Sequence, residues 1–276
     1  MSLAGRVLWP CWPVTVPFCI RRLEIPNTNE CLSSIALYLT NSLAWAYELD
    51  GNKTLAIDLY RKFFEKPVLY VSTQFEARCR RNYGVCLEQV GKYEEAVEQY
   101  KKAIEKMTEG SPEFKVYITY CSSMMKIWDK KTDKISFEWA EKTRNLFRNN
   151  NKFLSLNNIK IMQTYLRIAE MKKSMFSDIY IQEAKLYIYL LLLADDENMK
   201  KQYEHMIEEL LLFAETIAPG KIGTKFVRRD YYFAMSLLDS DAKQRGNLEI
   251  LAIAENEKLE KRGDAKDFSD LFCTEK

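Results

Sequence analysis

The sequence is poor in the two residues that break helices, with 9 glycines and 7 prolines among 276 residues. Four of the prolines lie before residue 27, and the others fall between segments with helical periodicity. Glycine and proline dominate the turns of β-rich and loop-rich folds, and proline is excluded from helix interiors. Their scarcity therefore excludes a low-complexity or turn-rich chain and favours an all-helical fold.

Residues that build common catalytic and metal sites are also scarce. His205 is the only histidine, and it lies among glutamates where we interpret it as a surface residue. The seven cysteines form no C-x-x-C pair, and no Walker or G-x-G-x-x-G phosphate motif occurs. We therefore predict no catalytic residues, no metal site and no cofactor. Cys79 and Cys86 are predicted to be buried thiols, which indicates a reducing, cytoplasmic setting.

Neither net charge nor apolar runs point to nucleic acid or a membrane. The chain has 41 basic and 39 acidic residues, so we expect no nucleic-acid partner. The run from Val7 to Ile20 contains three prolines, and both it and Leu186–Leu193 are too short to span a bilayer. We predict an irregular N-terminal arm over residues 1–28. The alternative is a membrane-surface insert carried by Trp9, Trp12 and Phe18.

The most informative stretch runs from Phe75 to Glu105. Apolar residues recur at helical spacing from about Gln74 to Gln89 and again from Tyr93, and Gly91 between them suits the left-handed end of a helix. Gly84 inside the first helix costs about 1 kcal/mol relative to alanine, which indicates close approach of another helix. The stretch therefore predicts a helical hairpin.

The same pattern occurs forty residues earlier. Gly51, Ala56 and Tyr60 precede Gly91, Ala96 and Tyr100 by forty residues each. A single hairpin cannot bury both faces of its helices, so such repeats are stable only when they stack. The internal repeat therefore predicts stacked hairpins.

This pattern resembles the tetratricopeptide repeat (TPR) family. The resemblance rests on a small residue late in the first helix, the turn glycine, a Tyr-Glu-Glu-Ala start of the second helix, an aromatic residue and a final alanine. These positions are Gly84, Gly91, Tyr93–Ala96, Tyr100 and Ala103. The period of forty exceeds the family's 34, and we place the additional residues around 67–71. The resemblance implies an all-α, right-handed superhelical solenoid of five or six hairpins.

The predicted organisation has four parts. After the arm, residues 29–108 form two TPR-like hairpins, residues 109–264 form divergent hairpins of the same stack, and residues 265–276 form a C-terminal tail. In the divergent part, Asp129–Asp133 is predicted to be a turn. Leu186–Leu193 is continuously apolar, which predicts a helix buried on several sides.

The resemblance also implies a binding surface, because the first helix of each TPR hairpin lines a concave groove. Arg78 and Arg81 lie on one helical face and suit acidic segments of a partner. In the alternative interpretation they are solvated or pair with Glu48 or Glu88. Asn82 matches an asparagine of the TPR subfamily that clamps carboxylates, but Asn41 and Trp45 replace that subfamily's first-hairpin residues. The candidate binding residues are Tyr38, Asn41, Trp45, Arg78, Arg81, Asn82, Val85 and Gln89.

The function expected from the sequence is that of a non-enzymatic scaffold that holds a protein or peptide in its concave surface, with acidic segments among the candidate partners. The alternative is a peptide-sensing or regulatory module of a signalling or transcription-regulatory system, without its DNA-binding or ATPase domain. TPR-type stacks form the sensing part of such systems.

Overall fold

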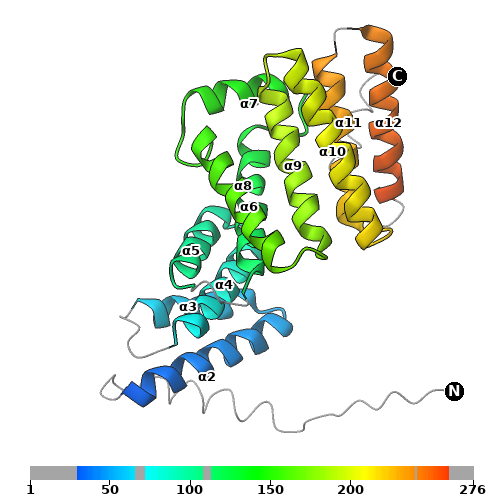
Figure 1. Cartoon of the computed structure of the whole chain (residues 1–276). Helices are drawn as coiled ribbons and strands as arrows, with labels where there is room; N and C mark the ends of the chain where they lie inside the picture. Colours follow the sequence, from blue (N-terminus) through cyan, green and yellow to red (C-terminus); the bar gives the residue numbers. More distant parts are fainter. Residues whose placement is uncertain (1–29, 66–71, 108–112, 240, 261–276) are drawn as a thin grey trace, which may run out of the picture. The chain divides into compact units, whose positions relative to one another are not determined.

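The computed structural model describes residues 30–65, 72–107, 113–239 and 241–260. Within these ranges the chain forms eleven α-helices, α2 to α12, and no strands (Figure 1). The all-α prediction is therefore confirmed. The predicted arm over 1–28 and the predicted tail over 265–276 lie outside the described residues. The chain divides into two compact units, Met1–Glu113 and Phe114–Lys276.

Unit 1 contains four described helices that form two hairpins. In the first hairpin α2 (Glu30–Leu49) packs against α3 (Lys53–Phe64), and in the second α4 (Thr73–Gln89) packs against α5 (Tyr93–Glu105). The two hairpins meet because α4 also contacts both α2 and α3. The helix boundaries predicted around Gly91 are correct to within one residue.

The turns of the two hairpins have the same backbone structure. Gly51 and Gly91 adopt left-handed φ angles of 80° and 77°. Each glycine N–H donates to the carbonyl three residues earlier, Glu48 or Glu88, at 3.1 and 3.0 Å. The next N–H donates to the carbonyl five residues earlier, at 2.8 and 2.9 Å. This is the Schellman arrangement, which satisfies carbonyls at the end of the first helix and reverses the chain.

The buried positions of the two hairpins also correspond. Ala56 and Tyr60 of α3 are buried, as are Ala96 and Tyr100 of α5. Across residues 51–60 and 91–100 the order of buried, intermediate and exposed residues is the same. The forty-residue spacing therefore relates two hairpins of the same local structure.

Gly84 permits a close contact within the second hairpin. A methyl group built at Gly84 would lie 2.8 Å from Cδ1 and Cζ of Tyr100, a fully buried ring. Real Cβ atoms do not approach a ring this closely, so no other residue fits here without repacking. The predicted close helix approach at Gly84 is confirmed, and Ala44 occupies the corresponding position of α2.

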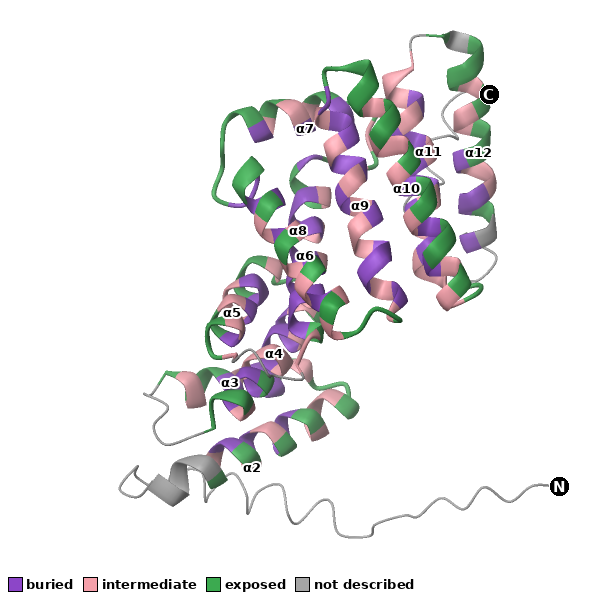
Figure 2. Cartoon of the chain, in the orientation of Figure 1, coloured by how far each residue is buried: buried purple, intermediate pink, exposed green. Residues whose placement is uncertain are grey.

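Unit 2 is built around one central helix. Helix α9 (Ser177–Leu193) contacts α6 (Lys115–Lys131), α7 (Trp139–Arg148), α8 (Leu156–Lys172), α10 (Glu197–Ile217) and α11 (Ile222–Leu238). Helix α12 (Ala242–Glu260) packs against α11. Buried residues occur on several sides of α9, which confirms the prediction made for Leu186–Leu193 (Figure 2).

The turn predicted for Asp129–Asp133 begins later than predicted. The structure continues α6 to Lys131, so Asp129 belongs to the last turn of that helix and the connection begins at Thr132. The Thr132 hydroxyl donates to the carbonyl of Trp128 at 2.7 Å and fixes the end of the helix. This extension places the Asp129 side chain next to α9 rather than in a surface loop.

No helix among the described residues combines the length and the apolar character that a bilayer crossing requires.

Candidate functional site

The predicted binding residues lie on two neighbouring helices of unit 1, α2 and α4. Asn82 Nδ2 donates to Asn41 Oδ1 at 3.0 Å, and Gln89 Nε2 donates to Glu48 Oε1 at 2.6 Å. Nearer the start of α2, the ring of Tyr38 stacks on Phe75 with centroids 5.7 Å apart. The contacts advance in the same direction along both helices, so α2 and α4 run parallel. We call the outward side of this pair the α2–α4 surface.

Several of the predicted residues bind one another. Asn41 Oδ1 accepts a second hydrogen bond from the buried hydroxyl of Tyr60, at 2.8 Å. Burial is the largest of the effects that raise the pKa of Tyr60, so this hydroxyl remains a proton donor. Arg81 Nη1 donates to Asn82 Oδ1 at 3.3 Å. Asn41, Asn82 and Arg81 therefore belong to a network that joins α2, α3 and α4, in which the side-chain oxygens of both asparagines already accept hydrogen bonds.

Arg78 forms an ion pair that the sequence did not suggest. Its Nε lies 2.7 Å from Glu113 Oε1, and its side chain remains 48% exposed. The alternative pairing with Glu48 or Glu88 is not observed. Glu48 binds Gln89, and Glu88 accepts a hydrogen bond from Tyr100. The positive charge expected on this surface is therefore partly neutralised.

The most exposed part of the α2–α4 surface is apolar. Tyr38 and Trp45 are 63% and 60% exposed, and Ile35 and Leu49 are 48% and 68% exposed. Together with exposed Ser42 they recur at alternating three- and four-residue steps, which places them along one line of α2. We call these five residues the α2 stripe. Prediction from the sequence had included only Tyr38 and Trp45.

The corresponding positions of α4 are different in character. Those residues, forty positions after their counterparts in α2, are Phe75, Arg78, Asn82, Val85 and Gln89, of which only Phe75 and Val85 are apolar. Val85 and Asn82 are partly buried, and Gln89 is exposed but bound to Glu48. The α2 stripe thus carries most of the exposed apolar area of this surface. Ile35 and Leu49 continue the helical spacing of Tyr38 and Trp45, and this spacing was a signal that could have identified them.

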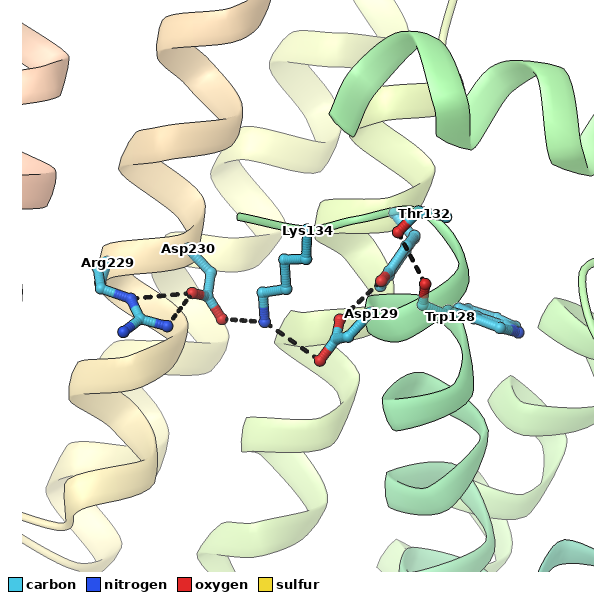
Figure 3. Close-up of polar contacts among 7 residues, drawn as sticks. Trp128, Asp129, Thr132, Lys134, Arg229 and Asp230 are labelled. Atoms are coloured by element: carbon cyan, nitrogen blue, oxygen red, sulfur yellow. Dashed lines mark hydrogen bonds and ion pairs between the residues drawn. The ribbon is translucent and has the colours of Figure 1, made fainter. Parts of the chain in front are cut away.

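A second polar arrangement lies in the interior of unit 2 (Figure 3). Arg229 and Asp230 of α11, Lys134 of the α6–α7 connection and Asp129 of α6 form a row of alternating charges, which we call the charged row. Arg229 Nη2 lies 2.8 Å from Asp230 Oδ1, and Lys134 Nζ lies 2.5 Å from Asp230 Oδ2 and 3.3 Å from Asp129 Oδ2. The row is continued by Tyr189 of α9, whose hydroxyl donates to Asp129 Oδ1 at 2.7 Å.

The pKa values in this region follow from competing burial and charge. Burial alone would raise the pKa of Asp230, but Lys134, Arg229 and Lys185 outweigh it and lower the pKa to about 2. Burial would lower the pKa of Lys134, but Asp129 and Asp230 hold it above its ordinary value. For Lys185 of α9, burial and the charge of Lys134 prevail, and its pKa is lowered. Asp230 and Lys134 are therefore ionised at neutral pH.

The charged row leaves little room for a ligand. A cavity of about 10 Å³ lies between Asp129, Lys134, Lys185 and Asp230, with Trp139 and Tyr189 in its wall. This volume is about that of one water molecule and is too small for an organic substrate. Sequence reasoning missed the row because the residues of α6 and α11 that form it are far apart in the sequence and each is ordinary in its local context.

Other polar groups give no further site among the described residues. No group of three or more His, Cys, Asp or Glu side chains there is placed to hold a metal ion. His205 is 70% exposed and lies 3.2 Å from Glu209, one helical turn away. Cys79, Cys86 and Cys121 are buried thiols, as predicted for the first two. Burial raises the pKa of Cys79 and of Cys86 to about 12, so these thiols are poor nucleophiles.

No protein-family model matches the chain, and a search of curated proteins finds no match either.

Proposed function

We propose that the protein is a non-enzymatic module that binds a protein or peptide partner through the α2–α4 surface of unit 1. In this proposal the hairpins belong to a TPR-like solenoid, and the partner lies along the first helices of the hairpins. The buried free thiols favour a reducing compartment, and the proposal places the protein in the cytoplasm.

The α2 stripe is the observation that carries this proposal. Four large apolar side chains in one line are uncommon on the surface of a soluble protein unless something binds there. Trp45 and Leu49 are more than half exposed, and burying side chains of this size contributes roughly 1.5–3 kcal/mol each. Aromatic residues of this kind are frequent energetic centres of protein interfaces. The partner is therefore expected to present apolar side chains to α2.

The arginines of α4 play a smaller part in the proposal than the sequence suggested. An acidic side chain of a partner would have to displace Glu113 from Arg78 or bind beside the existing pair. Exposed ion pairs contribute about 0–1 kcal/mol, so such an exchange adds little affinity. An acidic partner would gain orientation from Arg78, while most of the binding free energy would come from the α2 stripe.

The polar interior of unit 2 fits a structural role better than a catalytic one. Asp230 is bound by two cations and Lys134 by two carboxylates, so the strongest acids and bases of the charged row are already paired. The adjoining cavity has room for a water molecule only. A catalytic acid or base must reach a substrate atom, and this geometry offers no space for one.

Partner capture tests the proposal with two matched variants. Leu49→Glu places a charge in the α2 stripe, and Leu212→Glu places the same charge on α10, where the leucine is equally exposed at 68%. Capture by the wild-type chain, with the bound proteins identified by mass spectrometry and confirmed with the purified partner, should reveal a partner. We expect that binding to fall at least tenfold in Leu49→Glu and to be unchanged in Leu212→Glu. Equal binding by both variants would show that the surface is wrongly assigned.

A further inference from the structure

The residues of the α2 stripe are arranged almost symmetrically about its central residue, Ser42. Its positions, 35, 38, 42, 45 and 49, lie almost equally on both sides of Ser42. Ile35 and Leu49 are each seven residues from Ser42, and Tyr38 and Trp45 are four and three residues away. This three-four alternation over two heptads is the spacing of a two-helix seam. At 1.5 Å per residue the stripe is about 21 Å long.

Ser42 is the small member of the stripe, and it lies at the centre. The side chains at the contact set how closely two helices approach, and the smallest allow the closest approach. A serine hydroxyl can both donate and accept a hydrogen bond, so two serine hydroxyls that meet can satisfy each other. An aromatic side chain stands on either side of Ser42, and an aliphatic side chain stands at either end of the stripe. When a second stripe is rotated by 180° about Ser42, its aliphatic, aromatic and serine positions therefore face positions of the same kind in the first.

The residues beside the stripe are suited to burial. Of the described side chains that flank it on α2, those of Leu39, Asn41 and Ala46 carry no charge, and Glu48 is a carboxylate held by Gln89. Asn41 is satisfied inside unit 1 by Tyr60 and Asn82. A partner that covers the stripe would therefore bury few charged groups that lack a partner at the centre of the contact.

These observations select one occupant. We infer that the α2 stripe pairs with the α2 stripe of a second copy of this chain, in antiparallel orientation, about a twofold axis at Ser42. In this pairing Ile35 meets Leu49 of the second copy, Tyr38 lies within one residue of Trp45, and the two Ser42 residues meet where the helices cross. The same patch serves both subunits, as a twofold interface requires. The inference rests on the proposed function, because it names the partner of the same surface.

Charge favours the antiparallel orientation. A parallel pair would place Glu48 at the same height along the helix axis as Glu48 of the second copy, on the opposite flank of a seam that excludes water. The antiparallel pair sets these two carboxylates about 18 Å apart along the helix axis, because twelve residues separate position 48 from the position it faces. This distance is well beyond the screening length at physiological salt, so the repulsion between the two carboxylates is small.

The size of the stripe sets the expected strength. Its exposed side chains contribute roughly 500 Å² per copy, or about 1,000 Å² for the pair, which is near the lower limit of specific interfaces. We therefore expect a reversible dimer with a dissociation constant in the micromolar range. A chain that is monomeric in dilute solution and dimeric at about 100 µM would have this property.

The first experiment is sedimentation velocity of the full chain from about 1 to 200 µM, with charge exchange at the axis. Ser42 is exposed, so its replacement leaves the interior of unit 1 unchanged. Ser42→Asp and Ser42→Lys each place two like charges in contact, so each alone should weaken the dimer at least tenfold. An equimolar mixture of the two, distinguished by different tags, should form a heterodimer at least tenfold stronger than either variant alone. Leu212→Glu is the control on a distant helix, and its dimer should be unchanged.

A second experiment tests the orientation. Ile35→Lys and Leu49→Glu each place a charge opposite an apolar side chain in the antiparallel pair, so each should weaken the dimer. The chain that carries both changes should dimerise more strongly than either single variant, because each new cation then faces a new carboxylate. A parallel pair predicts the opposite, since like charges would meet at both ends.

Three results would overturn the inference. The first is a wild-type chain that stays monomeric at the highest concentration. The second is a dimer that is insensitive to both charges at position 42. The third is an equimolar mixture of Ser42→Asp and Ser42→Lys that dimerises no more strongly than either variant alone, although each variant keeps the circular dichroism of the wild type. Capture of a different partner that depends on Leu49, by a chain that stays monomeric, would leave the proposed function standing and remove only the self-pairing.

Discussion

The two units of the molecule order their interiors in different ways. In unit 1 the same three features occur in both hairpins: a left-handed glycine, a buried alanine and a buried tyrosine, each forty residues apart. In unit 2 the charged row, a buried network of ion pairs, joins α6, α11 and the connection before α7 beside the central helix α9. The comparison teaches that a repeated hairpin is specified locally, whereas a core with buried charges is specified by residues distant in sequence.

The difference has energetic consequences. In unit 1 the features that the two hairpins share are apolar contacts and backbone turns, so a change at one of them leaves no buried charge without its partner. In unit 2 each member of the charged row compensates the burial of its neighbours, so removal of one leaves the others unpaired. Buried pairs are costly to break even where they add little net stability. The following predictions test this contrast, beginning with the largest expected effect.

Asp230→Asn should be the most damaging of these changes. It leaves the cations of Lys134 and Arg229 without their shared carboxylate, and we expect the free energy of unfolding to fall by about 3–5 kcal/mol. The native Asp230 has a lowered pKa, so the stability that it contributes is present above about pH 4 and is lost as the pH falls towards 2. Urea denaturation at several pH values measures both effects.

The control is Asp58→Asn in unit 1, where the carboxylate forms an exposed pair with Arg61 at 2.9 Å. Its effect should be within about 0.5 kcal/mol. If Asp230→Asn were as mild as the control, or if it left the loss of stability between pH 4 and 2 unchanged, the charged row would not have the role assigned to it.

Gly84→Ala should destabilise unit 1 by about 2 kcal/mol, because the added methyl group collides with the buried ring of Tyr100. Gly246→Ala is the control, since a methyl group there meets no atom within 4 Å in the interior of α12. Alanine is the better helix former, so the control should gain about 0.5–1 kcal/mol. Thermal and urea unfolding followed by circular dichroism would reveal the opposite signs, and a gain at both positions would contradict the close contact.

Gly51→Ala and Gly91→Ala should cost nearly the same, about 1 kcal/mol each, because both glycines have left-handed φ angles and open space around them. Asparagine tolerates this conformation better, so Gly51→Asn and Gly91→Asn should cost less. The measurement is the midpoint of urea unfolding for the four variants. A difference of more than about 1 kcal/mol between the two alanine variants would break the equivalence of the hairpins.

Lys185→Met should stabilise unit 2 by about 1 kcal/mol. The lowered pKa of Lys185 means that the folded environment disfavours its charged form, so an apolar side chain of similar length removes a penalty at neutral pH. The penalty lessens as the pH rises towards the ordinary pKa of lysine, and the gain from the variant should shrink accordingly. Lys201→Met on the exposed side of α10 is the control and should change stability by less than about 0.5 kcal/mol. Equal effects of the two variants at pH 7 and pH 10 would oppose this account.

Most of the secondary structure could be predicted because it depends on neighbouring residues. The turn at Gly91, the start of α5 at Tyr93 and the buried character of α9 follow from local spacing and composition. The error at Asp129 had a tertiary cause. Asp-Lys-Lys-Thr-Asp has the composition of a turn, but the Asp129 carboxylate is bound by Lys134 and by Tyr189 of α9, and the helix continues to Lys131. Such contacts can override local propensity, because each contributes about as much free energy as the secondary-structure preferences of several residues together.

The candidate site was only partly predictable for a related reason. The family resemblance selected helix positions and thereby reached Tyr38, Trp45 and the α4 residues. It could not show that Asn41 and Asn82 bind each other, or that Glu113 lies beside Arg78, because these pairs are 41 and 35 residues apart. Which outward positions remain exposed depends on the neighbouring helices. The spacing of the α2 stripe could be recognised in the sequence, but the exposure of its side chains could not.

The placement of the tryptophans offers an optical way to observe the two units separately. Trp128 and Trp139 are almost fully buried in unit 2, where the indole of Trp128 donates to the carbonyl of Phe153, whereas Trp45 is largely in water. Unfolding of unit 2 should shift indole emission towards longer wavelengths. Association at α2 should shift the Trp45 contribution towards shorter wavelengths, and Trp45→Phe should remove that blue shift alone. Comparison of the wild type with Trp45→Phe, which both retain Trp9 and Trp12, can thus distinguish loss of the core from occupation of the surface.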